Sequence, residues 1–208
     1  MKTPVLSSHI SNSHERTLEK LRLGGIVAFP TDTVYGVGAS ACNTKAVQRL
    51  YVAKRRTHEK AIPVMIGRIS DVSKVAMDIS TKAQQLMDMF WPGALTLVLR
   101  KLPTISTSVS SVSTIAVRVP DHAWLLSLLK DSGPLAVTSA NRSGGNNPNS
   151  VSDVLEDLSD YLDLVIDGGD SGGGLPSTIV DCTVEPIRII RNGAISRDSI
   201  YHVLDNPD

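Results

Sequence analysis

The chain is poor in the residues on which several classes of protein depend. Its 208 residues include only two cysteines, Cys42 and Cys182, which are far apart and not in a metal-binding spacing. A disulfide framework is therefore not expected, and a reducing compartment, the cytoplasm, is the predicted location. The five histidines are scattered along the chain, so the sequence predicts no His/Cys metal site.

Long apolar runs are absent as well. No stretch approaches the roughly 18 apolar residues that a membrane-spanning helix needs. Residues 1–21 lack the apolar segment of a signal peptide. We therefore expect no membrane partner.

Excess charge and aromatic residues are also missing. The 21 basic and 21 acidic residues balance, and aromatic residues make up only 4% of the chain. A protein that coats nucleic acid through its overall charge would be more basic, so any polyanion binding must be local. One local cluster stands out, with Lys54, Arg55, Arg56 and Lys60 within seven positions. It is either an anion site or a solvated helix end.

The elements that the sequence does contain alternate along the chain. Apolar periodicity and capping signals predict helices at 14–23, 44–54, 80–90, 121–130, 150–158 and 196–204. Short apolar runs predict strands at 26–29, 62–66, 94–99, 114–119, 134–138, 163–167, 177–183 and 187–191. This interleaving indicates an α/β (mixed α+β) fold, and the strands 62–66, 94–99, 134–137 and 177–180 are candidates for the sheet centre. With no linker or change in composition, we expect residues 1–208 to form a single domain.

Three polar segments follow predicted strands, where open sheets place their sites. The first, residues 29–38, offers the hydroxyls of Thr31 and Thr33, and its glycines Gly36 and Gly38 permit a close backbone approach to a ligand. A plain turn before a helix would have the same composition. The second, residues 137–145, places small polar side chains beside glycine, which suits a phosphate or a nucleotide as well as it suits a capped loop.

The third segment has five glycines in the seven positions 168–174. It is either a flexible surface loop or a loop that closes over a ligand and brings Ser177 and Thr178 to it. The sequence does not choose between the two.

Two arginines lie in or at the end of apolar strands. Arg118 lies within residues 114–119, and Arg191 ends residues 187–191. A buried arginine needs a partner such as a carboxylate or a phosphate, and an internal acid would serve as well as a ligand. The aspartates considered as partners for these arginines, or as ligands of Mg²⁺, are Asp32, Asp167, Asp170 and Asp181.

Familiar catalytic patterns are missing. The chain has no GxxxxGK[ST] loop, no GxGxxG after its first strand, no Ser-His-Asp arrangement and no convincing carboxylate pair. Basic groups, hydroxyls and glycine loops suit a site that binds and positions anions and stabilises charge electrostatically.

Seven segments in order carry a resemblance to a known family. They are FPTDTVYGVG, AKRR with Lys60 following, FWPGALTLVL, AVRVPDH, TSANRSG, STIVD and IIRNGAIS, over about residues 14–200. The chain resembles the YrdC-type L-threonylcarbamoyladenylate synthases in their minimal, single-domain form. The resemblance implies a twisted, largely mixed sheet flanked by helices around a concave basic cleft. It implies an enzyme, a nucleotidyltransferase that converts L-threonine, bicarbonate and ATP into threonylcarbamoyl-AMP and pyrophosphate.

The resemblance also assigns roles by position. Lys54 and Arg56 are implied as the catalytic pair at the phosphates. ATP is expected to contact Arg56, Lys60, Thr114, Ser139, Ala140, Asn141, Pro148 and Arg191. L-Threonine is expected to contact Thr33, Arg118, Thr138 and Ser177. Mg²⁺ is expected to arrive with ATP, so no protein-held metal is predicted.

Partners follow from the same resemblance. Transferase proteins are expected to pass the threonylcarbamoyl group to an adenosine beside the anticodon of tRNA, with direct RNA binding secondary. The sequence departs from the family pattern at three positions. Thr57 and Asn192 stand where proline is usual, and Met65 stands where many members have a histidine.

Two alternatives belong to other classes. The chain would act as an RNA-binding or ribosome-associated protein if its basic surface bound RNA without turnover, although few aromatic residues are available for stacking. It would instead be a carbamoyl-transfer domain of the kind found in much longer chains with zinc and acylphosphatase modules, but those modules are absent from this sequence.

Overall fold

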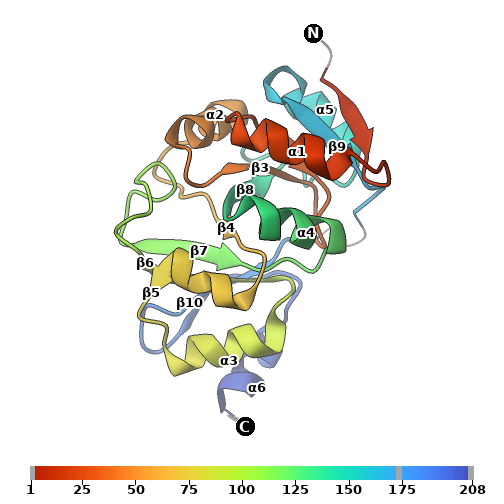
Figure 1. Cartoon of the computed structure of the whole chain (residues 1–208). Helices are drawn as coiled ribbons and strands as arrows, with labels where there is room; N and C mark the ends of the chain where they lie inside the picture. The colour runs from red at the N-terminus through yellow and green to blue at the C-terminus, as the bar shows by residue number, and fades with distance from the viewer. Residues whose placement is uncertain (1–2, 172–174, 206–208) are drawn as a thin grey trace.

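One large mixed sheet organises the chain in a computed structural model that describes residues 3–171 and 175–205 (Figure 1). Its strands, in chain order, are β1 Val5–Ser7, β2 Val27–Phe29, β3 Gly36–Ser40, β4 Val64–Met65, β5 Ala76–Met77, β6 Leu95–Lys101, β7 Thr114–Arg118, β8 Leu135–Ser139, β9 Leu164–Asp167, β10 Thr178–Asp181 and β11 Arg188–Arg191. The spatial order is β1-β9-β2-β3-β8-β4-β7-β6-β10-β11, with β5 pairing with β6 off this path. Parallel and antiparallel neighbours alternate irregularly, which confirms the predicted mixed sheet flanked by helices.

Helices cover both faces of this sheet. They are α1 Ser13–Arg22, α2 Thr44–Lys54, α3 Thr81–Phe90, α4 Ala123–Ser132, α5 Val151–Leu158 and α6 Arg197–Asp205, with short 3₁₀ turns η1 Ile69–Lys74 and η2 Ser159–Tyr161. Leucines of α1 and α4 share one buried cluster with β2, β8 and β9. The larger cluster joins α2, α3, α5 and α6 to the other strand side chains. Figure 1 shows α1 beside α4, and α3 beside α6 near the C-terminus.

The predicted sheet centre was partly wrong. Strands β8 and β4 do lie in the middle, but β10, which corresponds to the predicted strand at 177–180, lies second from one end. The central position between β2 and β8 is taken by β3, in a segment that the sequence assigned to a loop. β1 and β5 are short strands that lacked an apolar run strong enough to predict them.

Gly36 and Gly38 lie in β3 for a packing reason. A Cβ atom at Gly38 would lie 2.9 Å from the ring of Phe29, and one at Gly36 would lie 3.0 Å from Val137. These glycines therefore allow side chains of β2 and β8 to pack over β3. This packing explains the need for glycine at both positions without the expected approach to a ligand.

Helix ends agree with the sequence to within two residues. Asn43, Ser80 and Ser150 cap α2, α3 and α5 through their side chains. Ser13 is the first residue of α1, and the side chain of His122 caps α4. Burial lowers the pKa of His122, although the Asp32 carboxylate acts in the opposite direction, so its ring stays neutral and free to accept the Leu125 N–H.

Helix α2 ends on a residue that is strained. Arg55 has φ 49° and ψ 42°, in the left-handed region that a side chain disfavours. We expect Arg55→Gly to raise the free energy of unfolding by up to ~1 kcal/mol in urea denaturation, because glycine adopts this conformation freely. Gln48→Gly, at an exposed interior position of the same helix, is the matched control and should lower it by about 1 kcal/mol. Loss of stability in both variants would contradict the strain.

Candidate functional site

The turn between β2 and β3 is held rigid by its own threonines. The Thr31 hydroxyl donates to the Val34 carbonyl at 2.7 Å and accepts the Thr33 and Val34 N–H groups at 3.1 and 3.3 Å. It also lies 3.0 Å from the Thr33 hydroxyl. Thr31 therefore shapes the turn, while Thr33 has capacity left for another partner.

That partner is Arg118, at the end of β7. Its side chain is only 4% exposed, and its Nη1 donates to the Thr33 hydroxyl at 3.1 Å. Nη2 forms an ion pair with Asp32 at 2.6 Å, and Nε donates to the Gly93 carbonyl at 2.8 Å. The sequence left open whether a buried Arg118 pairs with a phosphate or a carboxylate, from a ligand or from the protein, and Asp32 is an internal carboxylate partner. Burial lowers the Arg118 pKa, and the Asp32 charge partly restores it.

This contact crosses the sheet. Three strands, β3, β8 and β4, separate β2 from β7 in the spatial order. Thr33 and Arg118 consequently meet over the face of the sheet and not between neighbouring strands. Such a contact agrees with a curled sheet, although the concave basic cleft expected from the sequence stays a prediction.

A second arginine, Arg191, lies within the electrostatic influence of Arg118. Arg191, at the end of β11, donates from Nε and Nη2 to the Ser177 carbonyl at 3.0 and 2.8 Å and from Nη2 to the Ser177 hydroxyl at 3.1 Å. Burial lowers its pKa, and the positive charge of Arg118 lowers it further. Arg118 thus contacts Thr33, and Arg191, an exposed residue, contacts Ser177. Thr178, in contrast, is fully buried, and its hydroxyl donates to the Ile195 carbonyl.

A second group forms around Lys54. Its ammonium is buried and donates to the Ser139 carbonyl, to the Asn141 carbonyl at 2.6 Å and to Asn141 Oδ1 at 3.3 Å. Asn141 Nδ2 in turn donates to the carbonyls of Gly145 and Asn146, both at 2.9 Å. All three ammonium donors are used within the protein, so Lys54 fixes the loop after β8. Burial, and secondly the charge of Arg56, lowers the Lys54 pKa to about 8.

The rest of the charge cluster is less buried. Arg56 is half-buried, and it donates to the carbonyls of Lys60 and Ala61, both at 2.8 Å. Lys60 itself is exposed. Arg56 therefore braces the turn that presents the Lys60 ammonium to solvent. Arg55 is exposed, as expected for a solvated helix end.

The remaining predicted residues lie in β7, in β8 and in the segment that follows β8. Thr138 pairs with Val37 of β3. The Ala140 N–H donates to the Tyr35 carbonyl and the Pro148 carbonyl accepts the Tyr35 N–H, both at 2.8 Å. Thr114 starts β7, four residues before Arg118, so about 13 Å separates their Cα atoms.

The three departures from the family pattern fall in different surroundings. Met65 pairs with Arg118 in the register of β4 and β7, and it is buried. Thr57 and Asn192 are exposed.

Tyr35 is a residue whose importance the sequence did not reveal. Its hydroxyl donates to the Gly169 carbonyl at 2.7 Å and accepts the Gly168 N–H at 3.2 Å. Together with its backbone bonds to Ala140 and Pro148, this ties the β2–β3 turn to the loops after β8 and β9. An unmatched buried tyrosine hydroxyl is the signal that predicts such a partner, but the partner lies 134 residues away. Of the glycine run that follows, 172–174 lies outside the described residues.

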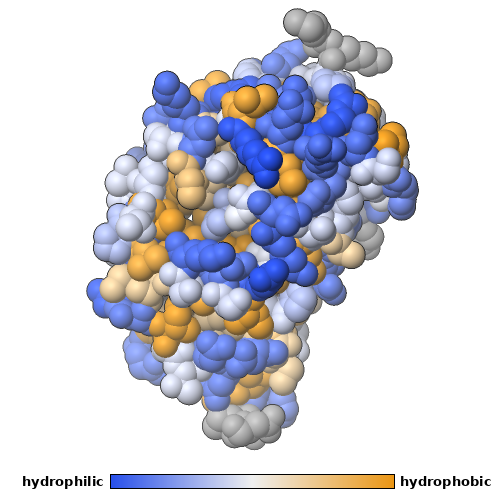
Figure 2. Space-filling view, in the orientation of Figure 1, coloured by the Kyte–Doolittle hydropathy of each residue, from blue (hydrophilic) through white to orange (hydrophobic). Residues whose placement is uncertain are grey.

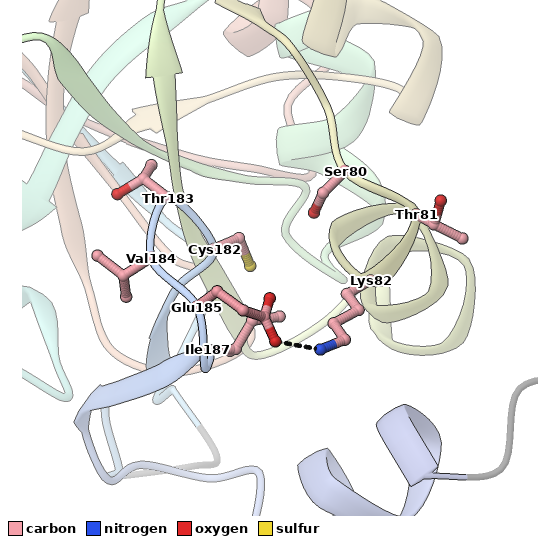
Figure 3. Close-up of a pocket in the computed structure, with 8 residues that line it drawn as sticks. All are labelled: Ser80, Thr81, Lys82, Cys182, Thr183, Val184, Glu185 and Ile187. Atoms are coloured by element: carbon pink, nitrogen blue, oxygen red, sulfur yellow. Dashed lines mark hydrogen bonds and ion pairs between the residues drawn. The ribbon is translucent and has the colours of Figure 1, made fainter.

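One pocket of the structure lies away from the predicted site residues. Figure 3 shows a pocket of about 410 Å³ between the first turn of α3 and the segment 182–187, where an ion pair joins Lys82 to Glu185. None of the predicted site residues lines it. Figure 2 shows hydrophilic and hydrophobic residues interspersed on the face seen in Figure 1, with hydrophilic residues dense over α1.

Two further findings concern metals and membranes. Within residues 3–171 and 175–205, no three His, Cys, Asp or Glu side chains come together as a metal site would require. None of the helices in the same ranges is both long and apolar enough to span a bilayer.

The fold defines the class: an α/β protein built on one large mixed sheet with helices on its faces. The family model Sua5/YciO/YrdC, described as "telomere recombination", matches residues 19–193, and the chain belongs to this family. The threonylcarbamoyl-AMP synthase of Bacillus subtilis (strain 168) is 41% identical over 187 residues, covering 88% of this chain and 54% of that protein. The chain thus spans about half the length of the first curated relatives it matches.

Solved structures agree on the fold. The crystal structure of P. abyssi Sua5 complexed with L-threonine matches with a TM-score of 0.92 and 35% identity, over 97% of this chain and 60% of that one. The structure of E. coli YciO matches with a TM-score of 0.84 at 23% identity, over 95% and 97% of the two chains, and shows the shared fold alone.

Proposed function

We propose that the protein is an L-threonylcarbamoyladenylate synthase, a nucleotidyltransferase that makes threonylcarbamoyl-AMP and pyrophosphate from L-threonine, bicarbonate and ATP. The observations that carry the proposal are two arginine–hydroxyl pairs, Arg118 with Thr33 and Arg191 with Ser177, in which the charge of Arg118 acts on Arg191. The two guanidinium groups carry two positive charges, and the carboxylate of Asp32 balances only one of them. The excess suits the carboxylate of an amino acid and the phosphates of a nucleotide.

The reaction divides between the two groups of residues. We assign L-threonine to Thr33, Arg118, Thr138 and Ser177. We assign ATP to the set Arg56, Lys60, Thr114, Ser139, Ala140, Asn141, Pro148 and Arg191. Lys54 acts as a positioning residue, because its donors hold the Ser139–Asn141 loop.

Charge governs the chemistry. The threonine amine and bicarbonate form a carbamate and water. A carbamate oxygen then attacks the α-phosphorus of ATP, and the bond to the β-phosphate breaks as pyrophosphate leaves. Both reactants are anions, so cationic side chains reduce their repulsion and stabilise the transition state. The described residues form no acidic cluster for a metal, so Mg²⁺ would be held by the ATP phosphates.

The wider role follows from the same proposal. Transferase proteins would take the threonylcarbamoyl group to an adenosine next to the anticodon of tRNA, in the cytoplasm. The L-threonine complex of the Sua5 relative and the synthase names of the curated relatives support L-threonine as the substrate and threonylcarbamoyl-AMP as the product.

Turnover without RNA tests the proposal. Incubation with L-threonine, bicarbonate and Mg-ATP should release pyrophosphate, and mass spectrometry should detect threonylcarbamoyl-AMP. Omission of threonine or bicarbonate should abolish the release. If the protein binds RNA but releases no pyrophosphate that depends on threonine and bicarbonate, the proposed enzyme activity is wrong. The protein would then be an RNA-binding protein.

A further inference from the structure

The ion pair between Arg118 and Asp32 is incompletely satisfied. A guanidinium carries five N–H groups, and Arg118 directs three of its contacts to Gly93, Thr33 and Asp32. On the other side, Asp32 Oδ1 is buried without a hydrogen-bond partner, while Oδ2 takes the bond to Arg118. Leaving such groups unpaired costs free energy. The spare N–H groups of Arg118 and the free Oδ1 of Asp32 therefore indicate a ligand that pairs with both.

The unfilled positions have a definite chemical pattern. The spare N–H groups of Arg118 suit an anion, and the spare oxygen of Asp32 suits a cation or an N–H donor. They belong to one ion pair, so the two functions lie within a few ångströms of each other. An α-amino acid zwitterion carries a carboxylate and an ammonium at this spacing. ATP alone would match the arginine but not the aspartate.

The surroundings restrict the alternatives. The Asp32 side chain is 13% exposed although its Oδ1 atom is buried, so part of the side chain reaches the surface beside the ion pair. The charge of Arg118 also acts on a second cation, Arg191, whose positive charge favours an incoming carboxylate and disfavours an ammonium at the arginine itself. The Asp32 side of the pair is thus left for the amino group.

We propose that Asp32 recognises the α-amino group of the amino-acid substrate while Arg118 binds its carboxylate. This proposal rests on the proposed function, since L-threonine is the substrate named there. The hydrogen bond would orient the nitrogen that becomes the carbamate nitrogen, which keeps one N–H after carboxylation. Asp32 is therefore a substrate-binding residue that the family resemblance did not assign.

Direct binding tests the role without relying on turnover. Isothermal titration calorimetry would compare L-threonine with (R)-3-hydroxybutanoate, which lacks only the amino group, on wild type and on Asp32→Asn. Wild type should prefer L-threonine by roughly tenfold or more, as expected for a hydrogen bond between charged groups. Asp32→Asn should lose most of this preference, because threonine binds more weakly while the analogue changes by less than about threefold.

Controls separate the possible failures. Asp121→Asn removes the same charge from an exposed carboxylate three residues beyond Arg118, and it should keep the preference. A preserved preference in Asp32→Asn overturns the inference, and tighter binding of both ligands means that Asp32 competes with the carboxylate. If Asp32→Asn does not fold, the wild-type comparison decides alone, because equal affinity for the two ligands contradicts the proposal. Absence of threonine binding to wild type would instead count against the proposed function.

Discussion

Replacing Arg118 by lysine is expected to lower kcat/KM for L-threonine by roughly 100-fold or more while the protein stays folded. Lysine keeps the positive charge beside Asp32 but loses the guanidinium geometry. The contacts of Nε to Gly93 and of Nη1 to Thr33 cannot both be rebuilt by one ammonium. An ammonium also cannot bind a substrate carboxylate through two parallel N–H groups, and a hydrogen bond to a charged group contributes about 1.5–3 kcal/mol, so losing one such bond to L-threonine accounts for the expected effect.

Lysine is the informative choice because alanine would confuse two effects. Arg118→Ala would leave the Asp32 charge unpaired, and removing one partner of a buried pair costs about 3–5 kcal/mol of stability. Arg100→Lys is the matched control, since Arg100 pairs with Asp78 at 3.1 Å on an exposed part of β6. Pyrophosphate release would be measured against threonine concentration, with thermal melts alongside. Equal kcat/KM in Arg118→Lys and wild type would remove Arg118 from the threonine site.

Replacing Lys54 by methionine is expected to lower kcat/KM for ATP by about 100-fold or more, with a lower melting temperature. The methionine would leave the Ser139 carbonyl, the Asn141 carbonyl and Asn141 Oδ1 without their donor. The loop that carries Ser139, Ala140 and Asn141 would then lose its fixed position. Lys45→Met, at an exposed position of the same helix, should behave as wild type.

The same lysine predicts a pH dependence. Because its pKa in the folded protein is lowered to about 8 from 10.5, Lys54 loses its proton first in the folded state. The folded protein holds fewer protons than the unfolded chain between these values, so this group makes the free energy of unfolding rise with pH across that window. ATP affinity should change in the opposite direction and weaken above pH 8, as the ammonium loses its charge and a donor. The alkaline weakening should disappear in Lys54→Met, and its persistence there would assign it to another group.

Arg118 shows what sequence alone can give about this site. Its position in an apolar strand predicted a partner such as a carboxylate or a phosphate, and the partner found is the internal carboxylate of Asp32. The alternation of apolar runs likewise predicted an α/β fold with helices on the faces of a sheet, and most helix ends. These inferences work because they depend on local periodicity and on the cost of an unpaired charge, which are the same in any fold.

Lys54 shows where such reasoning fails. A lysine in a run of charges is usually solvated, and nothing local indicates that its ammonium binds a loop 85–87 residues further along the chain. The same holds for Tyr35 and Gly169, and for strand β3, whose glycines weaken the strand pattern. In each instance the deciding partner comes from a distant part of the chain, so only the folded arrangement reveals it.

The glycines of β3 also limit how the sequence of this sheet can vary. At Gly38 an added methyl group would meet the Phe29 ring at 2.9 Å, and at Gly36 it would meet Val137 at 3.0 Å. A larger residue at either position is compatible with the fold only if its neighbour becomes smaller in the same lineage. Positions 29, 36, 38 and 137 should consequently change together in related sequences, as one coupled unit beneath the turn that carries Asp32 and Thr33.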